Sequence, residues 1–106
     1  MKIIGYHSTK LKAYRKIIIN GFNPVKYKNH YNHGRVITWF TKEPQFLYGD
    51  ICIKVNLTGF NCNISDDLII CYDHYIPSNR IIGKLEYSYL EKIQIFDRDK
   101  VIDLFY

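Results

Sequence analysis

Lys2-Ile3-Ile4-Gly5-Tyr6-His7-Ser8-Thr9 opens a chain of 106 residues and sets the expectation for its fold. The apolar residues and the aromatic residue before the histidine predict a strand over residues 2–8. His7 and the two hydroxyl residues stand where this strand gives way to a helix. Polar side chains at such junctions often contact ligands, because loops carried by a rigid scaffold hold most binding residues. His7 is therefore a candidate binding residue.

A helix is predicted over residues 9–20, and Ser8 or Thr9 can cap its N-terminus. Its apolar residues recur at helical spacing and predict one buried face: Leu11, Tyr14, Ile17 and Ile18. Gly21 follows at a C′ position, where a positive φ costs glycine little. Phe22 is expected to pack back on the domain.

The rest of the chain alternates between strand patterns and turn signals. Strands are predicted over 35–41, 51–57, 68–72, 80–86 and 90–96. Between them we expect loops over 23–34 and 58–66, a short helix from Pro44, a turn over 75–79, and a helix or strand end over 99–106. The fold class is therefore α+β: one domain, 1–106, with a strand-rich sheet core and one clear N-terminal helix.

Charge is distributed unevenly along the chain. Residues 1–42 hold nine Lys or Arg and no acidic residue, whereas residues 43–106 hold six Lys or Arg and ten Asp or Glu. A basic field of this kind suits an anionic ligand such as a pyrophosphate, a phosphorylated substrate or nucleic acid. The alternative is a basic helix face that is simply solvated.

Several classes of protein are disfavoured by composition. Hydrophobic residues make up 47% of the chain, so disorder is not expected. No run of 18 apolar residues or signal-peptide pattern occurs, so we expect a cytoplasmic protein without a membrane partner. The three cysteines (Cys52, Cys62 and Cys71) are odd in number and widely spaced, which favours free thiols over a disulfide framework.

Two other constellations are weaker. His30 and His33 could approach a metal ion, but no cysteine pair or third ligand lies near them, so no metal is expected. Cys71 and His74 could form a nucleophile and base, yet on a strand they fall on opposite faces, and burial of Cys71 fits better.

The order of motifs resembles the ADP-ribosyltransferase superfamily, in its histidine-bearing branch. Those proteins open with a His-Gly-Thr or His-Ser-Thr motif at the end of the first strand, followed by a helix ending near Gly-Phe. Trp39-Phe40-Thr41, Tyr48 and Tyr75-Ile76-Pro77 match later motifs. The resemblance spans roughly residues 3–86, with a compressed connection between Phe40 and Tyr48.

The resemblance implies NAD as the substrate and assigns roles to individual residues. His7 would bind and orient the nicotinamide ribose, with Ser8 or Thr9 in support. Tyr48 would stack on the nicotinamide ring, and Trp39 or Phe40 would form the pocket wall. The pyrophosphate would meet basic side chains: Arg35, Lys10, Lys12 and Arg15.

The resemblance also requires a carboxylate to stabilise the oxocarbenium-like transition state. The family supplies a Glu on a later strand. In this chain no Glu occurs between Tyr48 and Ile76-Pro77. The acids available are Asp66, Asp67, Asp73 and, on the following strand, Glu86. Asp67 is the first choice and Glu86 the second.

The implied function is transfer or hydrolysis of ADP-ribose with a protein or nucleic-acid acceptor. Ile, Lys, Asn and Tyr, which have AT-rich codons, account for 46 of the 106 residues, a bias that fits a bacterial toxin or a phage or viral effector. The alternative is a non-catalytic binding module or inhibitor, which would use the same fold and its basic face to bind a protein or nucleic acid. A third reading, RNA 2′-phosphotransferase chemistry, would need several basic side chains gathered on one phosphate.

Overall fold

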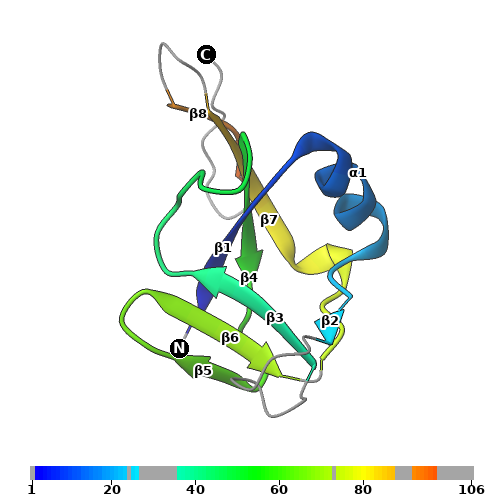
Figure 1. The fold of residues 1–106 in the computed structure, drawn as a ribbon, viewed down its shortest axis with the longest axis vertical. Helices are drawn as coiled ribbons and strands as arrows, with labels where there is room; N and C mark the ends of the chain where they lie inside the picture. The colour runs from blue at the N-terminus through cyan, green and yellow to red at the C-terminus, as the bar shows by residue number, and fades with distance from the viewer. Residues whose placement is uncertain (1, 24, 27–35, 73, 88–91, 98–106) are drawn as a thin grey trace.

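The opening stretch forms strand β1 (Ile4–Thr9) at the centre of an antiparallel sheet (Figure 1). β1 pairs with β4 (Ile51–Asn56) along its whole length, from Ile4 opposite Asn56 to Thr9 opposite Ile51. The computed structural model describes residues 2–23, 25–26, 36–72, 74–87 and 92–97.

The remaining strands of the described residues flank this central pair. They are β2 (Val25–Lys26), β3 (Val36–Thr41), β5 (Cys62–Ile64), β6 (Leu68–Tyr72), β7 (Ile81–Tyr87) and β8 (Lys92–Asp97). The sheet order is β5-β6-β3-β1-β4-β7-β8, with β2 beside β3, and every pairing is antiparallel. Within the described part of the chain α1 (Leu11–Asn20) is the one α-helix, and η2 (Ser78–Arg80) is a 3₁₀ turn. The α+β class is confirmed.

The sheet splits between β1 and β3. These strands share a single Cα pair, Tyr6 opposite Thr41, whereas β1 and β4 share six. Beside this pair the Thr41 hydroxyl lies 2.7 Å from the Glu43 carbonyl oxygen and 3.2 Å from the Tyr6 carbonyl oxygen, so its single hydrogen is shared between the two acceptors. Among the described residues no further Cα pair joins β1 to β3, and the His7 side chain reaches from β1 to the Trp39 carbonyl oxygen on β3.

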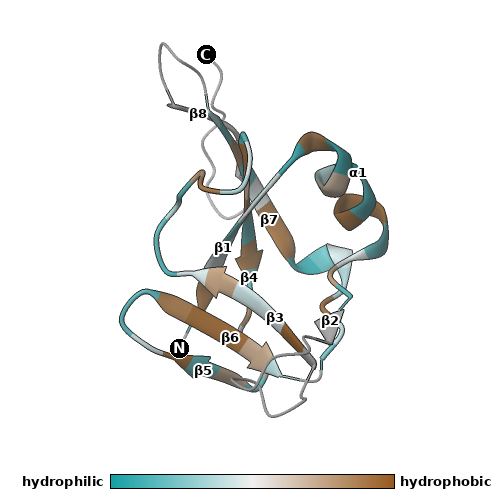
Figure 2. Cartoon of the chain, viewed as in Figure 1, coloured by the Kyte–Doolittle hydropathy of each residue, from teal (hydrophilic) through white to brown (hydrophobic). Residues whose placement is uncertain are grey.

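The core lies where the two halves of the sheet meet. Its fully buried side chains include Phe40, Ile53, Val55, Leu57, Ile69 and Ile76. Figure 2 shows hydrophobic residues along β6 and in patches on β3 and α1. Gly5 permits this packing, because a Cβ there would lie 2.8 Å from Phe40 Cβ. The glycine thus lets β1 approach the central aromatic ring.

The start of the helix differs from the predicted one. Lys10 is the N-cap residue, and its side chain makes no capping hydrogen bond, so the Ser8 or Thr9 cap was wrong. Both residues belong to β1, and the Ser8 hydroxyl bonds instead to the segment around Tyr48. At the other end the expectation holds, because Gly21 has φ 76° and its N–H donates to Ile17 O at 2.7 Å.

The helix also buries a narrower face than its spacing predicts. Tyr14 and Ile17 pack against the core, whereas Leu11 and Ile18 remain 48% and 45% exposed. The helix lies against η2 and β4. Within the described residues, no helix combines the length and apolar character needed to cross a membrane.

Three predictions were wrong in part: two of the expected loops and the short helix from Pro44. β2 lies within the expected loop 23–34, and β5 lies within the expected loop 58–66, each recruited by pairing with a neighbouring strand. No helix begins at Pro44; the Gln45 side-chain oxygen instead accepts a hydrogen bond from Leu47 N at 2.7 Å. The expectation for 99–106 falls outside the described residues.

Candidate functional site

A pocket of about 820 Å³ opens beside the split in the sheet. This volume is typical of a small-molecule site. The described residues that line it are His7, Ile17, Phe22, Asn23, Ile37, Thr38, Trp39, Thr41, Gln45, Leu47, Tyr48, Leu68 and Ile70. Among these residues no side chain carries a fixed charge, so the lining offers apolar and aromatic surface and no ion pair to a ligand.

His7 is held in the pocket wall by a backbone hydrogen bond. Its Nδ1 lies 2.9 Å from the Trp39 carbonyl oxygen, and a carbonyl can only accept, so Nδ1 carries the proton. Burial lowers the pKa of His7 and outweighs this hydrogen bond, which acts to raise it. The imidazole is therefore neutral near pH 7, and Nε2 can accept a hydrogen bond from a ligand hydroxyl.

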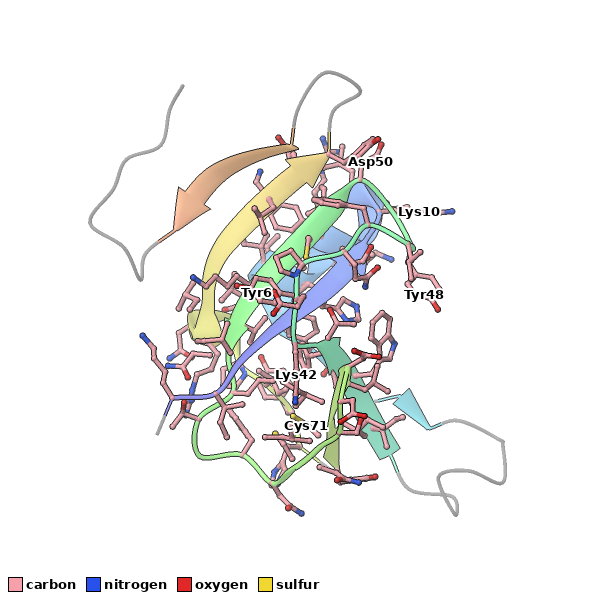
Figure 3. The ribbon with its side chains drawn as sticks, turned by 90° about the vertical axis from the view of Figure 1, so that its left-hand side faces the viewer. Tyr6, Lys10, Lys42, Tyr48, Asp50 and Cys71 are labelled. Carbon is pink, nitrogen blue, oxygen red and sulfur yellow. The ribbon has the colours of Figure 1, made fainter. Side chains whose placement is uncertain are left out.

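Aromatic rings surround the imidazole. The His7 ring centroid lies 4.6 Å from that of Trp39 and 5.2 Å from that of Phe22. Trp39 in turn makes an edge contact with Tyr48 at 5.3 Å. Tyr48 is 60% exposed and projects from the edge of the molecule in Figure 3. These rings offer flat faces to a planar ligand.

Ser8 fixes the segment that carries Tyr48. Its hydroxyl accepts a hydrogen bond from Tyr48 N at 3.0 Å and donates one to the Gly49 carbonyl at 3.5 Å. The Ser8 side chain is 2% exposed, so both bonds are shielded from water. Ser8 therefore does not line the pocket but positions a residue that does.

Two polar groups of the pocket were not among the residues predicted from the sequence. Thr38 Oγ1 and Gln45 Nε2 are buried and find no hydrogen-bond partner among the residues that the structure describes. Gln45 Oε1 is already bonded to Leu47 N, so the amide orientation leaves Nε2 as the free donor. Buried donors without partners are costly, which makes both groups candidates for ligand contacts. No spacing or motif marks them, because their status depends on tertiary neighbours.

The two carboxylates chosen from sequence do not line this pocket. Asp67 is exposed at the start of β6, where its carbonyl accepts a hydrogen bond from Lys42 N at 3.2 Å. It directly precedes Leu68, which does line the pocket. Glu86 lies on β7, forms an ion pair with Lys84 at 3.7 Å and faces a second pocket. The described lining of the pocket therefore includes neither Asp67, which directly precedes β6, nor Glu86.

The other predicted residues occupy varied positions. Phe40 has no exposed surface and belongs to the core, so of the two candidates for the pocket wall Trp39 is the one in place. Thr9 is buried at the end of β1. Lys10, Lys12 and Arg15 are exposed at the start of α1. Arg35 and Asp73 lie outside the described residues, as do His30 and His33.

The remaining constellations receive no support as reactive sites. Cys71 is buried and its thiol contacts Cys62, so it does not face His74 as a nucleophile would face its base. His74 instead packs edge-on against Phe60 at 5.7 Å. In the described part of the chain, no group of three metal-ligating side chains converges.

The burial of His7 predicts a pH dependence of stability. The folded pKa lies below the ordinary value of 6.5, so the unfolded chain takes up the proton first. Stability from the neutral imidazole is thus complete above pH 6.5 and is lost as pH falls through the folded pKa. We expect the melting temperature of the wild type to drop more steeply below this pH than that of His7→Gln. Parallel curves for the two proteins would contradict the assignment.

Comparisons with known proteins identify no relative. No family model, no curated protein and no solved structure matches this chain.

Proposed function

We propose that this pocket binds the nicotinamide riboside part of NAD and that the protein is an ADP-ribosyltransferase-like enzyme. It would transfer ADP-ribose to a protein or nucleic-acid acceptor of a host, or hydrolyse NAD. The observation that carries the proposal is the neutral His7 acceptor, which packs against Trp39, whose ring in turn contacts Tyr48.

The chemistry of the pocket matches the parts of this ligand. A ribose hydroxyl can donate to His7 Nε2, and the nicotinamide ring can pack on Tyr48 or Trp39. The uncharged lining suits the nucleoside better than the pyrophosphate. Lys10 is exposed and projects from the same edge of the molecule as Tyr48 (Figure 3), which gives the pyrophosphate a cation outside the pocket.

The reaction asks for one further group. The bond between ribose C1′ and the nicotinamide nitrogen breaks, and its electron pair leaves with neutral nicotinamide. A nucleophile from water or the acceptor then bonds to C1′ and releases its proton. Asp67 remains the proposed carboxylate for stabilising the cationic C1′ on the ground of the resemblance, and its exposed side chain would have to reach the ligand from outside the pocket lining.

NAD titration tests this proposal. Trp39 is the single tryptophan of the chain, so its fluorescence reports directly on the pocket. We expect NAD to quench it, and His7→Ala to weaken binding about tenfold through loss of one buried hydrogen bond. His74→Ala is the matched control, since His74 lies outside the lining of this pocket.

Nicotinamide release separates catalysis from binding. Asp67→Asn should retain NAD binding and lose most of the release measured by chromatography. A wild-type protein that neither binds millimolar NAD nor releases nicotinamide would refute the proposal.

The second candidate, a non-catalytic module that binds nucleic acid, is favoured by two observations. The described lining of the pocket contains no carboxylate. The helix also exposes Lys12, Arg15 and Lys16 and has no acidic residue in its first turn. Binding to random RNA should then fall steeply between about 50 and 200 mM salt, and Lys12→Gln with Arg15→Gln should flatten the slope. Salt-independent or absent binding would reject nucleic acid as the partner.

A further inference from the structure

Cys62 and Cys71 stand directly opposite each other on β5 and β6. Tyr72 N donates a hydrogen bond to Asn61 O in the adjacent pair, at 3.3 Å. Hydrogen-bonded and non-hydrogen-bonded pairs alternate along an antiparallel ladder, so the cysteines occupy a non-hydrogen-bonded pair. In such a pair the Cα atoms are about 4.5 Å apart and the side chains approach most closely. That separation falls within the range that a disulfide spans.

The two thiols already contact each other. Their Sγ atoms are 2.7 Å apart, and both cysteines are free. Cys71 is fully buried and Cys62 is partly exposed, so a reagent in solvent can reach one sulfur of the pair. The third cysteine, Cys52, is buried on β4 and provides an internal comparison.

We propose that Cys62 and Cys71 are an oxidisable pair that forms a reversible intrachain disulfide with a disulfide oxidant such as oxidised glutathione. The Cys62 thiolate attacks the oxidant, its S–S bond breaks, and one glutathione leaves as a thiolate. The Cys71 thiolate then attacks Cys62 Sγ and displaces the second glutathione. The two thiol protons pass to the two glutathione thiolates, so the protein loses two electrons and the oxidant gains them.

The order of attack follows from the environment of each sulfur. Burial, together with the hydrogen bond to the Cys62 thiol, raises the pKa of Cys71. Cys71 is therefore a poor first nucleophile but needs no movement to act second, because its partner sulfur is already in contact. Cys62 makes the first attack from its more accessible position.

A crosslink here would tie the outermost strand to a wall of the pocket. β5 lies at the edge of the sheet, and its neighbour β6 contributes Leu68 and Ile70 to the pocket. Figure 3 places Cys71 toward the end of the molecule away from Asp50, within this edge hairpin. The oxidised hairpin would lose the freedom to separate, so the oxidised protein should melt at a higher temperature.

The test is oxidation of the folded, full-length protein with oxidised glutathione. The free-thiol content should fall from three to one, with a mass decrease of two hydrogen atoms and a Cys62–Cys71 peptide in a non-reducing digest. Dithiothreitol should restore all three thiols and lower the melting temperature to its reduced value. Cys52→Ser should form the same bond, and Cys62→Ser should not.

Other products would overturn the proposal. These are retention of all three thiols, a glutathione adduct that persists on Cys62, a bond to Cys52, or a dimer linked between chains. Circular dichroism of each variant before oxidation confirms that the fold is retained. The wild-type digest decides the question even if a variant fails to fold.

Discussion

Phe40→Ala is expected to lower the free energy of unfolding by about 3–5 kcal/mol, the typical loss for removing a fully buried aromatic ring. Phe40 has no exposed surface and packs against Gly5 and the ring of Phe22, whose centroid is 5.3 Å away. Gly5 belongs to β1 and Phe22 follows α1, so these neighbours are held by separate elements and cannot collapse together into the space. Since small domains are stable by only about 5–15 kcal/mol, a substantial unfolded population should appear on mild heating.

Urea unfolding followed by circular dichroism measures this loss. Phe40→Leu should cost less, because it removes part of the ring volume and keeps an apolar side chain. Tyr48→Ala removes an aromatic ring that is 60% exposed and should change stability far less. Equal losses for Phe40→Ala and Tyr48→Ala would contradict the placement of Phe40 in the core.

The contrast between Phe40 and Trp39 marks the limit of prediction from sequence. Neighbours on a strand face opposite sides of the sheet, and here Phe40 is fully buried in the core whereas Trp39 lines the pocket. The sequence predicted the strand but left open which residue faced the pocket. The choice depends on Gly5, which brings β1 against Phe40 and leaves Trp39 on the other face. That contact joins residues 35 positions apart and has no local signature.

Local sequence patterns predicted the longer elements well. The spacing of apolar residues indicated β1, α1, β3, β4, β6 and β7, and Gly21 marked the end of α1. β5 was missed because three residues of an edge strand carry too little pattern and depend on pairing with β6. Ser8 was misassigned for a similar reason. A serine before a helix favours capping, but here its partner, Tyr48, comes from 40 residues further along the chain.

Within the candidate site, the order of motifs pointed to three residues with rings that line one pocket, and their roles toward a ligand stay predictions. His7, Trp39 and Tyr48 come from three segments and meet at one pocket. Gln45 and Thr38 became candidates only because tertiary packing buries a polar atom of each with no partner in the described part of the chain. The status of Asp67 rests on the resemblance and on its position next to Leu68, so its role stays a prediction.

Gly49→Ala is expected to displace the segment that carries Tyr48 and to open one side of the pocket. A Cβ at Gly49 would lie 2.2 Å from the Thr9 carbonyl oxygen and 2.7 Å from Lys10 N. Both are backbone atoms at the junction of β1 and α1, so no rotamer change relieves the clash. The segment must move away, which breaks the hydrogen bonds of the Ser8 hydroxyl to Tyr48 N and Gly49 O.

We expect Gly49→Ala to lower the free energy of unfolding by about 1–3 kcal/mol through overpacking. NAD binding should weaken by more than this destabilisation explains. Trp39 fluorescence is the direct readout, because the Trp39 ring contacts Tyr48 at 5.3 Å and should become more exposed to solvent. Gly59→Ala is the matched control: Gly59 has φ 95°, and a Cβ there would meet no atom closer than 3.9 Å. That variant should lose about 1 kcal/mol through backbone strain and leave the Trp39 emission unchanged. A Gly49→Ala protein with wild-type emission would show that the segment does not depend on the close approach at Thr9.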